Sequence, residues 1–266
     1  MSTKILRRAD GVVLVERFSP FRRVEHIVVI LTFAMLVLTG FPQKFYEATW
    51  ASWLLQVFGG LDQARFFHRV AGVVFAVHTG AHLLLFVAGV LLHKMRFSMV
   101  PVPQDLRDVV ATMAWYLGYR KHPPKYPKFD YRQKFEYLGM VLGGFVMIFS
   151  GLVLMYPGLL AEFLPGQVIP ASRMAHSNEA MLAFLVLIVW HAYGAIFSPE
   201  VFPLDRTMVT GFLTAEELEE RHGKEYDILF PNGHNPGQPR HGHADEVADA
   251  APVAAPASTE DEPKVG

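Results

Sequence analysis

The chain has 266 residues, of which 52% are hydrophobic and 18% are charged, and its formal net charge is −1. Soluble domains contain about 25% charged residues, so this composition favours a membrane protein, and the near-zero net charge gives no support to nucleic-acid binding. The sequence contains no cysteine, which excludes disulfides, thiolate-ligated iron–sulfur clusters and covalently attached c-type haem within this chain.

Four apolar runs are long enough to cross a bilayer, whose hydrocarbon core needs about 20 helical residues. We expect spans at about residues 24–42, 66–92, 137–157 and 175–197. The expected fold is therefore all-α: an integral membrane four-helix bundle over residues 24–205, preceded by an N-terminal segment of residues 1–23.

Positive charge is concentrated in the segments expected on one side of the bundle. Residues 93–136 carry nine Lys or Arg side chains, whereas residues 42–65 carry two and residues 157–174 carry one. Cytoplasmic loops collect Lys and Arg. We therefore expect a multi-pass protein of the bacterial inner membrane with both termini in the cytoplasm.

The segments outside the spans have patterns of their own. Leu106, Val110, Met113 and Leu117 recur at helical spacing and predict a short cytoplasmic amphipathic helix, which lies along the membrane interface or packs on the bundle. Residues 206–231 predict a helical extension in the cytoplasm, where Thr214 and the residue three positions later match a capping box. Residues 232–266 have the composition of a disordered tail.

Histidines lie inside the second and fourth spans, where ionisable side chains are rare and usually functional. His68 and His82 are 14 residues apart (82 − 68), and His176 and His191 are 15 apart (191 − 176). These spacings correspond to about 21 and 22 Å along a helix. Because the two spans run in the same direction, the histidines predict two matching depths, and neutral imidazole is a good axial ligand for haem iron. Hydrogen bonding of a single histidine to a neighbouring helix is the simpler alternative.

His26 lies at the inner end of the first span, at the depth expected for His82 and His191. Three imidazoles therefore compete for the two axial positions of an inner haem, and the spacing leaves the choice open. We interpret His78 as a helix-packing or haem-propionate-bonding side chain.

Four blocks carry a resemblance to known proteins: RFSPFRRVEHIVVILTFAMLVLTGFPQKF, FHRVAGVVF, KFDYRQKFEYLGMVLGGFVMIFSGLVLMYP and AHSNEAMLAFLVLIVWHAYGAIFSPEVFPLD. The sequence resembles the gamma subunit of formate dehydrogenase and related four-helix b-type cytochromes of membrane hydrogenases and thiosulfate reductases. It resembles more closely a bacterial cytochrome b/b6-domain group that is associated with multihaem c cytochromes. The resemblance covers most of residues 17–205.

The resemblance implies two b-type haems and their ligands. In the formate dehydrogenase type, the matching histidines pair His26 with His191 at the cytoplasmic-side haem and His68 with His176 at the periplasmic-side haem. A scheme like that of bc complexes pairs His82 with His191 instead. The fourth-span spacing is one residue longer here than in the formate dehydrogenase subunit.

The resemblance also implies a quinone site, for menaquinone or ubiquinone, beside the inner haem. Its matching positions are Asp130, Gln133 and His191, although Asp130 replaces an asparagine of the family and Arg132 a glycine. An interfacial anchor before the third span is the alternative role of this polar stretch.

The expected function is that of a di-haem cytochrome b subunit that carries electrons across the membrane. Its partners would be a periplasmic iron–sulfur or multihaem c-type subunit and the quinone pool, within an oligomeric respiratory complex, and it would not be catalytic alone. A membrane anchor or assembly subunit without haem is the alternative.

Overall fold

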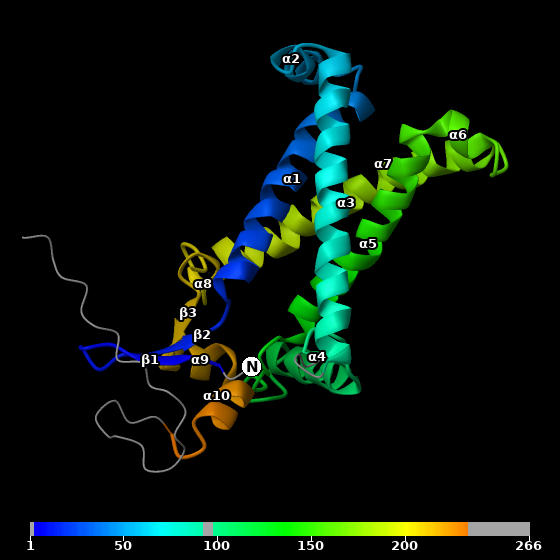
Figure 1. Ribbon diagram of the computed structural model, residues 1–266. Helices are drawn as coiled ribbons and strands as arrows, with labels where there is room; N and C mark the ends of the chain where they lie inside the picture. The colour runs from blue at the N-terminus through cyan, green and yellow to red at the C-terminus, as the bar shows by residue number, and fades with distance from the viewer. Residues whose placement is uncertain (1–2, 93–97, 234–266) are drawn as a thin grey trace, which may run out of the picture.

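The computed structural model describes residues 3–92 and 98–233. Four long helices of the described residues run past one another (Figure 1). Three are continuous, namely α1 (Pro20–Lys44), α3 (Leu61–Leu91) and α5 (Tyr131–Met155). The fourth, Val168–Phe197, is also apolar and long enough to span a membrane, and it brings the number of such helices in the described residues to four. The predicted all-α membrane fold is confirmed.

The long helices begin before the apolar runs that predicted them, because polar residues outside the hydrocarbon still form helical turns. Ser19 is the N-cap of α1, with Pro20 at the start of the helix, and its side chain accepts a hydrogen bond from the backbone N of Arg22. Asp130 is the N-cap of α5. Capped starts of this kind extend both helices beyond the expected bilayer boundary.

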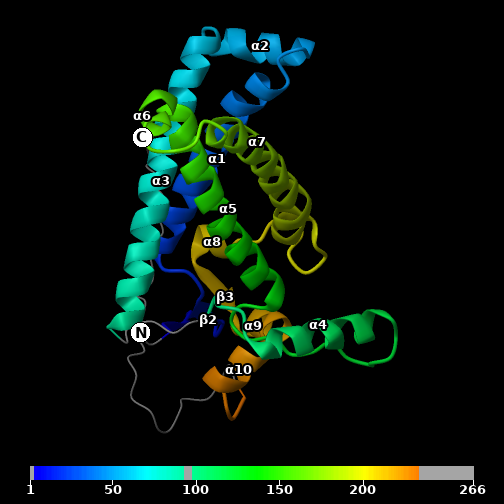
Figure 2. The ribbon, with the colours of Figure 1, turned by 90° about the vertical axis from the view of Figure 1, so that its right-hand side faces the viewer.

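The four helices form two antiparallel pairs. α1 packs along α3, and α5 packs along the fourth helix, whereas the two pairs touch each other over a smaller area. Figures 1 and 2 show this arrangement from perpendicular directions. The interior between the pairs is therefore the place to look for a site.

The fourth long helix changes its hydrogen-bonding pattern along its length. It begins as α7 (Val168–Leu185) and continues as the π-helical segments η1 (Val186–His191) and η2 (Tyr193–Phe197). A π-turn bonds residue i to residue i+5 and so holds one more residue than an α-turn. The change begins after His176 of α7, and η1 ends at His191.

Short helices lie at the end of the bundle where α1 connects to α3 and α5 connects to α7 (Figure 1). Residues 42–65, expected only as a loop, contain α2 (Thr49–Val57), and α6 (Pro157–Ala161) follows α5. Trp50 and Trp53 of α2 are exposed. Tryptophan is enriched where a membrane protein meets the bilayer–water boundary.

A small α/β unit, which we call the cap, lies at the other end of the bundle. Its antiparallel sheet has the order β1-β2-β3, formed by β1 (Ile5–Arg7), β2 (Val13–Glu16) and β3 (Phe212–Thr214). In register, Ile5 faces Val15, and Val15 faces Leu213. The remaining elements are α8 (Thr207–Thr210), α9 (Ala215–Arg221) and α10 (Gly223–Leu229).

The cap has its own hydrophobic core, made by Val13, Val15, Leu213, Ala215, Leu218, Tyr226 and Phe230. The sequence analysis assigned no strand to residues 1–23 and only helix to residues 206–231, so it missed this sheet. The capping box is present: Thr214 N donates to Glu217 Oε2 at 2.9 Å, and Glu217 N donates to Thr214 Oγ1 at 3.1 Å. The expected tail lies outside the described residues beyond residue 233.

The predicted amphipathic helix is α4 (Pro103–Tyr116). Its polar face is buried, and Asp105 forms an ion pair with Lys134 of α5 at 2.8 Å, while Asp108 pairs with Lys224 of α10 at 3.2 Å. Its apolar face is directed outward, with Leu106 70% and Val110 63% exposed. The helix therefore joins the bundle to the cap through its polar side.

Candidate functional site

Two histidines face each other near the end of the bundle that carries α2 and α6. His68 of α3 and His176 of α7 have ring centroids 6.2 Å apart, with an angle of 70° between the ring planes. We call them the distal pair. They come from different helix pairs, so they lie across the interior rather than within one helical hairpin.

A second facing pair lies near the cap. His26 of α1 and His191 of η1 have ring centroids 6.1 Å apart, with an angle of 55° between the planes. We call them the cap-side pair. Two imidazoles that bind opposite sides of one metal, with metal–nitrogen bonds of about 2 Å, place their ring centres roughly 6 Å apart. Both pairs have the spacing that such ligation requires.

Hydrogen bonding fixes the tautomer of His68. The Thr39 hydroxyl donates its hydrogen to the backbone oxygen of Met35 at 2.6 Å. Its oxygen also lies 3.0 Å from Nδ1 of His68, so it can only accept a hydrogen there. Nδ1 therefore carries the proton, and the lone pair of Nε2 is left for a metal.

His176 is held in the same way from the opposite side of the interior. The Ser150 hydroxyl donates to the backbone oxygen of Val146 at 2.5 Å and lies 2.9 Å from Nδ1 of His176. Helices α1 and α5 thus supply equivalent hydroxyl groups to the two members of the distal pair. Each arrangement directs an unprotonated Nε2 toward coordination.

A glycine follows each hydroxyl residue and makes room for the ring. A Cβ atom added at Gly40 would lie 2.9 Å from Cε1 of His68, and one added at Gly151 would lie 3.3 Å from Cε1 of His176. A side chain at Gly40 therefore forces the ring to move, whereas one at Gly151 requires a shift of only a few tenths of an ångström. The sequence analysis missed this pairing of hydroxyl and glycine, although the dipeptides TG and SG within apolar runs were the available signal.

The cap-side pair has a different neighbour. Nδ1 of His191 lies 3.1 Å from the carboxylate Oε2 of Glu136, on α5. If Nε2 of His191 binds a metal, Nδ1 donates to this carboxylate. A charged acceptor therefore takes the place that a neutral hydroxyl has at each histidine of the distal pair.

His82 is engaged elsewhere and does not face His191. Its Nδ1 lies 3.1 Å from Glu25 Oε1, and its Nε2 lies 3.2 Å from the Tyr137 hydroxyl. Arg22 contacts both His82 and Glu25. Of the two competing candidates, the structure brings His26 opposite His191 and leaves His82 in this polar cluster. His78 lies on the same helix, and its Nε2 is buried without a hydrogen-bond partner among the described residues.

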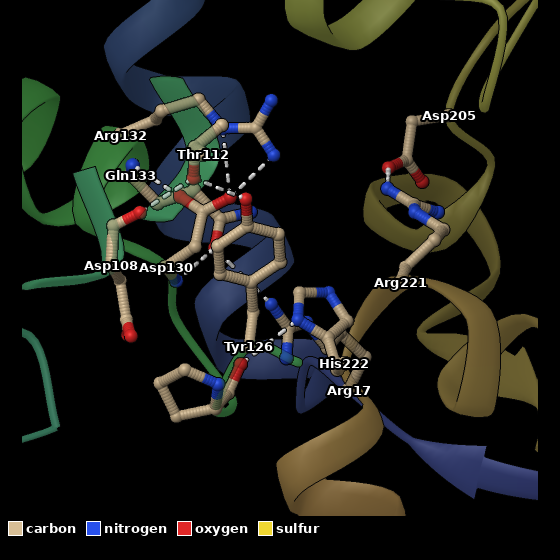
Figure 3. Close-up of polar contacts among 11 residues, drawn as sticks. Arg17, Asp108, Thr112, Tyr126, Asp130, Arg132, Gln133, Asp205, Arg221 and His222 are labelled. Atoms are coloured by element: carbon tan, nitrogen blue, oxygen red, sulfur yellow. Dashed lines mark hydrogen bonds and ion pairs between the residues drawn. The ribbon is translucent and has the colours of Figure 1, made fainter. Parts of the chain in front are cut away.

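Two of the three residues implied for a quinone site, Asp130 and Gln133, form the capping box at the start of α5 (Figure 3). Asp130 is buried; its Oδ1 accepts a hydrogen bond from Gln133 N at 3.0 Å, and its Oδ2 accepts from Arg132 at 2.7 Å. Gln133 Oε1 accepts from the Asp130 backbone N at 3.2 Å. Both side chains therefore serve to begin α5, and the quinone and interfacial-anchor roles stay predictions.

Charged groups of the cap surround this N-cap. Burial lowers the pKa of Arg17 to about 10 although Glu225 lies nearby, and Arg17 is also 3.5 Å from Gln133. Burial, followed by repulsion from Arg17, lowers the pKa of His222 to about 3. Its Nδ1 lies 3.0 Å from the backbone oxygen of Pro127. The cluster holds cap and bundle together.

A cavity of about 3650 Å³ extends from the distal pair to the cap-side pair. Its lining includes His26, His68, His82, His176 and His191. Sites for drug-sized ligands are typically about 300–1,000 Å³, so this partly open cavity has room for a planar macrocycle. In the described part of the chain, no three His, Cys, Asp or Glu residues gather as a metal-ion site. Paired imidazoles instead suit a metal whose other ligands come from a macrocycle, which is the ligation of haem iron.

The fold and the facing imidazoles define a class, that of helical membrane proteins of the cytochrome b type. The family model of prokaryotic cytochrome b561 matches residues 17–211, and the chain belongs to this family. It is a membrane b-type cytochrome that binds b-type haem and transfers electrons. The resemblance to cytochrome b proteins is thereby confirmed. No curated protein matches the chain significantly.

Proposed function

We propose that the chain holds two b-type haems and carries electrons across the bacterial inner membrane. The single observation that supports this most directly is the pair of facing imidazole sets, with ring centroids 6.2 and 6.1 Å apart. His68 and His176 would ligate the distal haem, and His26 and His191 the cap-side haem. Bound haem iron supplies one-electron exchange between its ferrous and ferric forms.

Residues of the chain orient the histidine ligands and determine the two depths at which the haems would bind. His176 and His191 are 15 residues apart on one helix (191 − 176), which corresponds to about 22 Å along its axis. Thr39 and Ser150 hold the distal imidazoles in the tautomer that leaves Nε2 unprotonated, and Gly40 and Gly151 allow the rings to lie against the helices. These features support two separate haem positions across the membrane.

The cap lies on the cytoplasmic side in this proposal. The nine cations of residues 93–136 support that orientation by the positive-inside rule, since this segment joins α3 to α5 at the cap end. The distal pair then lies toward the periplasm. A periplasmic iron–sulfur or multihaem c-type subunit would exchange electrons there, within an oligomeric respiratory complex.

We place quinone exchange at the cap-side level. The cluster of Arg22, Glu25, His82 and Tyr137 lines the cavity at this level and offers hydrogen-bond donors for a quinone carbonyl and groups that take up protons. Asp130 and Gln133 act in this proposal as positioning residues, because both side chains are used to begin α5. Menaquinone and ubiquinone both fit this chemistry.

A reduced-minus-oxidised optical spectrum of the purified full chain tests the proposal. We expect a b-type α band that is reduced to about half in H68L and in H191L. The matched control H82L removes an imidazole of similar depth and keeps the full band, and Y137F slows reduction by quinol without loss of haem. A colourless protein, or loss of half the band in H82L alone, contradicts the assignment and favours a membrane anchor or a different ligand set.

A further inference from the structure

The two proposed haem levels differ in the acceptors that bond their histidines. At the distal level, the Nδ1 atoms of His68 and His176 meet the neutral hydroxyls of Thr39 and Ser150 at 3.0 and 2.9 Å. At the cap-side level, Nδ1 of His191 meets the Glu136 carboxylate at 3.1 Å. The side chain of Glu136 is 18% exposed and that of His191 is 42% exposed, so the contact is partly buried.

The charge of the acceptor alters how strongly an imidazole donates electrons to a metal. A carboxylate that accepts the Nδ1 hydrogen raises the basicity of the ligand, whereas a hydroxyl does so much less. A more basic ligand stabilises ferric iron over ferrous iron and lowers the reduction potential. The contact between Glu136 and His191 therefore favours the lower potential at the cap-side level.

Cations also lie close to the distal level. Lys44 at the end of α1 contacts Ser177, the neighbour of His176, and Arg69 follows His68 directly. Nearby cations favour the reduced form of a metal centre because they stabilise its additional electron. Glu179 packs against Gly143 one turn beyond His176, between the two levels, and is not bonded to either distal histidine.

The cap-side level carries two carboxylates, and Arg22 offsets one of them. Glu25 pairs with Arg22 at 2.7 Å and with His82 at 3.1 Å. Glu136 has His191 as its only ion-pair or hydrogen-bond partner among the residues that the structure describes. No cation among these residues therefore forms an ion pair with this carboxylate besides His191.

We propose that Glu136 is a positioning residue that lowers the potential of the cap-side haem below that of the distal haem. This inference rests on the proposed function. The favoured transfer then oxidises ferrous iron at the cap-side level and reduces ferric iron at the distal level by one electron. Two such transfers balance the oxidation of one quinol to quinone, which releases two protons and two electrons. The periplasmic iron–sulfur or c-type haem partner is the acceptor.

Spectroelectrochemical titration of the purified full chain tests this order. We expect two one-electron waves, of which H191L removes the lower and H68L removes the higher. E136Q shifts the lower wave to a higher potential and leaves the other in place, and E136D, which keeps a carboxylate, retains much of the wild-type separation. The matched control E25Q removes a carboxylate at the same level that is bonded to His82, and it produces the smaller shift.

The outcomes separate this inference from the proposed function. Loss of the higher wave in H191L overturns the inference even if E136Q fails to retain haem, because the order is read from the histidine variants alone. An equal shift in E136Q and E25Q also overturns it, since the hydrogen bond would then have no specific effect. A protein without any haem instead contradicts the proposed function.

Discussion

Replacement of Gly40 by alanine is the sharpest structural test of the distal pair. The added Cβ would lie 2.9 Å from Cε1 of His68, whereas carbon atoms are comfortable at about 3.5 Å. The ring therefore has to retreat by roughly 0.6 Å. Nδ1 of His68 now lies 3.0 Å from Thr39 Oγ1. A movement of this size is enough to lengthen that distance beyond the range of a hydrogen bond.

We expect G40A to weaken haem binding at the distal level. Loss of a partner that orients a metal ligand typically lowers affinity by about 10–100-fold, equivalent to about 1.4–2.8 kcal/mol. G151A should have a smaller effect, because its Cβ would lie 3.3 Å from His176 and the required retreat is only about 0.2 Å. The rate of haem transfer to an acceptor protein, followed by absorbance, measures the difference.

Gly80 provides the matched control, since it lies in α3 with His68, is outside the cavity lining, and a Cβ added there meets nothing within 4 Å. We expect G80A to retain haem as the unmodified chain does. If G40A and G80A lose haem at the same rate, close packing of Gly40 on the ring has no role. If G40A loses the cap-side haem first, the assignment of His68 to the distal level is wrong.

Three further predictions concern the hydroxyl partners, α4 and the cap. T39V and S150A should each lower distal haem affinity by about tenfold without loss of the cap-side haem, because Nδ1–H loses its acceptor; difference spectra of the H191L background measure this. K134M should destabilise the docking of α4 by about 3–5 kcal/mol, since it leaves Asp105 buried and unpaired, and K134M with D105N should recover most of that loss; limited proteolysis after α4 is the assay. His222 has a pKa of about 3 when folded and 6.5 when unfolded, so the cap keeps its full stability above pH 6.5 and loses about 1.4 kcal/mol per pH unit below about 6. Hydrogen exchange in α9 and α10 should show that slope, and H222Q should remove it.

The sequence predicts the bundle well because long apolar runs signal transmembrane helices directly. The four spans and the polar–apolar division of α4 follow from hydropathy and helical spacing alone. The two depths of histidine follow from a fixed rise per residue. Local capping signals were equally direct, as Thr214 and Glu217 illustrate.

The sheet of the cap was not predictable by the same reasoning. β1 and β3 have three residues each, and β2 has four, which is too short for an alternating pattern to be distinctive. Leu14 of β2 pairs with Thr214, which lies 200 residues further along the chain. Pairing across such a separation depends on how the bundle brings the two ends of the domain together.

The choice between His26 and His82 as the partner of His191 also depends on the three-dimensional structure. Both histidines lie at a similar depth, so helical rise could not separate them. What separates their positions is the side-chain environment: Glu25 and Tyr137 bond both nitrogens of His82, while the ring of His26 faces His191. The contact of Tyr137 with His82 joins α5 to α3, and no spacing within one helix reports it.

Native mass spectrometry of the intact chain, released from detergent, tests the central claim most directly. The account predicts a mass increase of two haems per chain, of one haem in H68L and in H191L, and of none in the double variant. H82L should retain both haems. A chain that carries no haem, or one whose haem count is unchanged by H68L and H191L, would contradict the claim that the two facing imidazole pairs hold the cofactors.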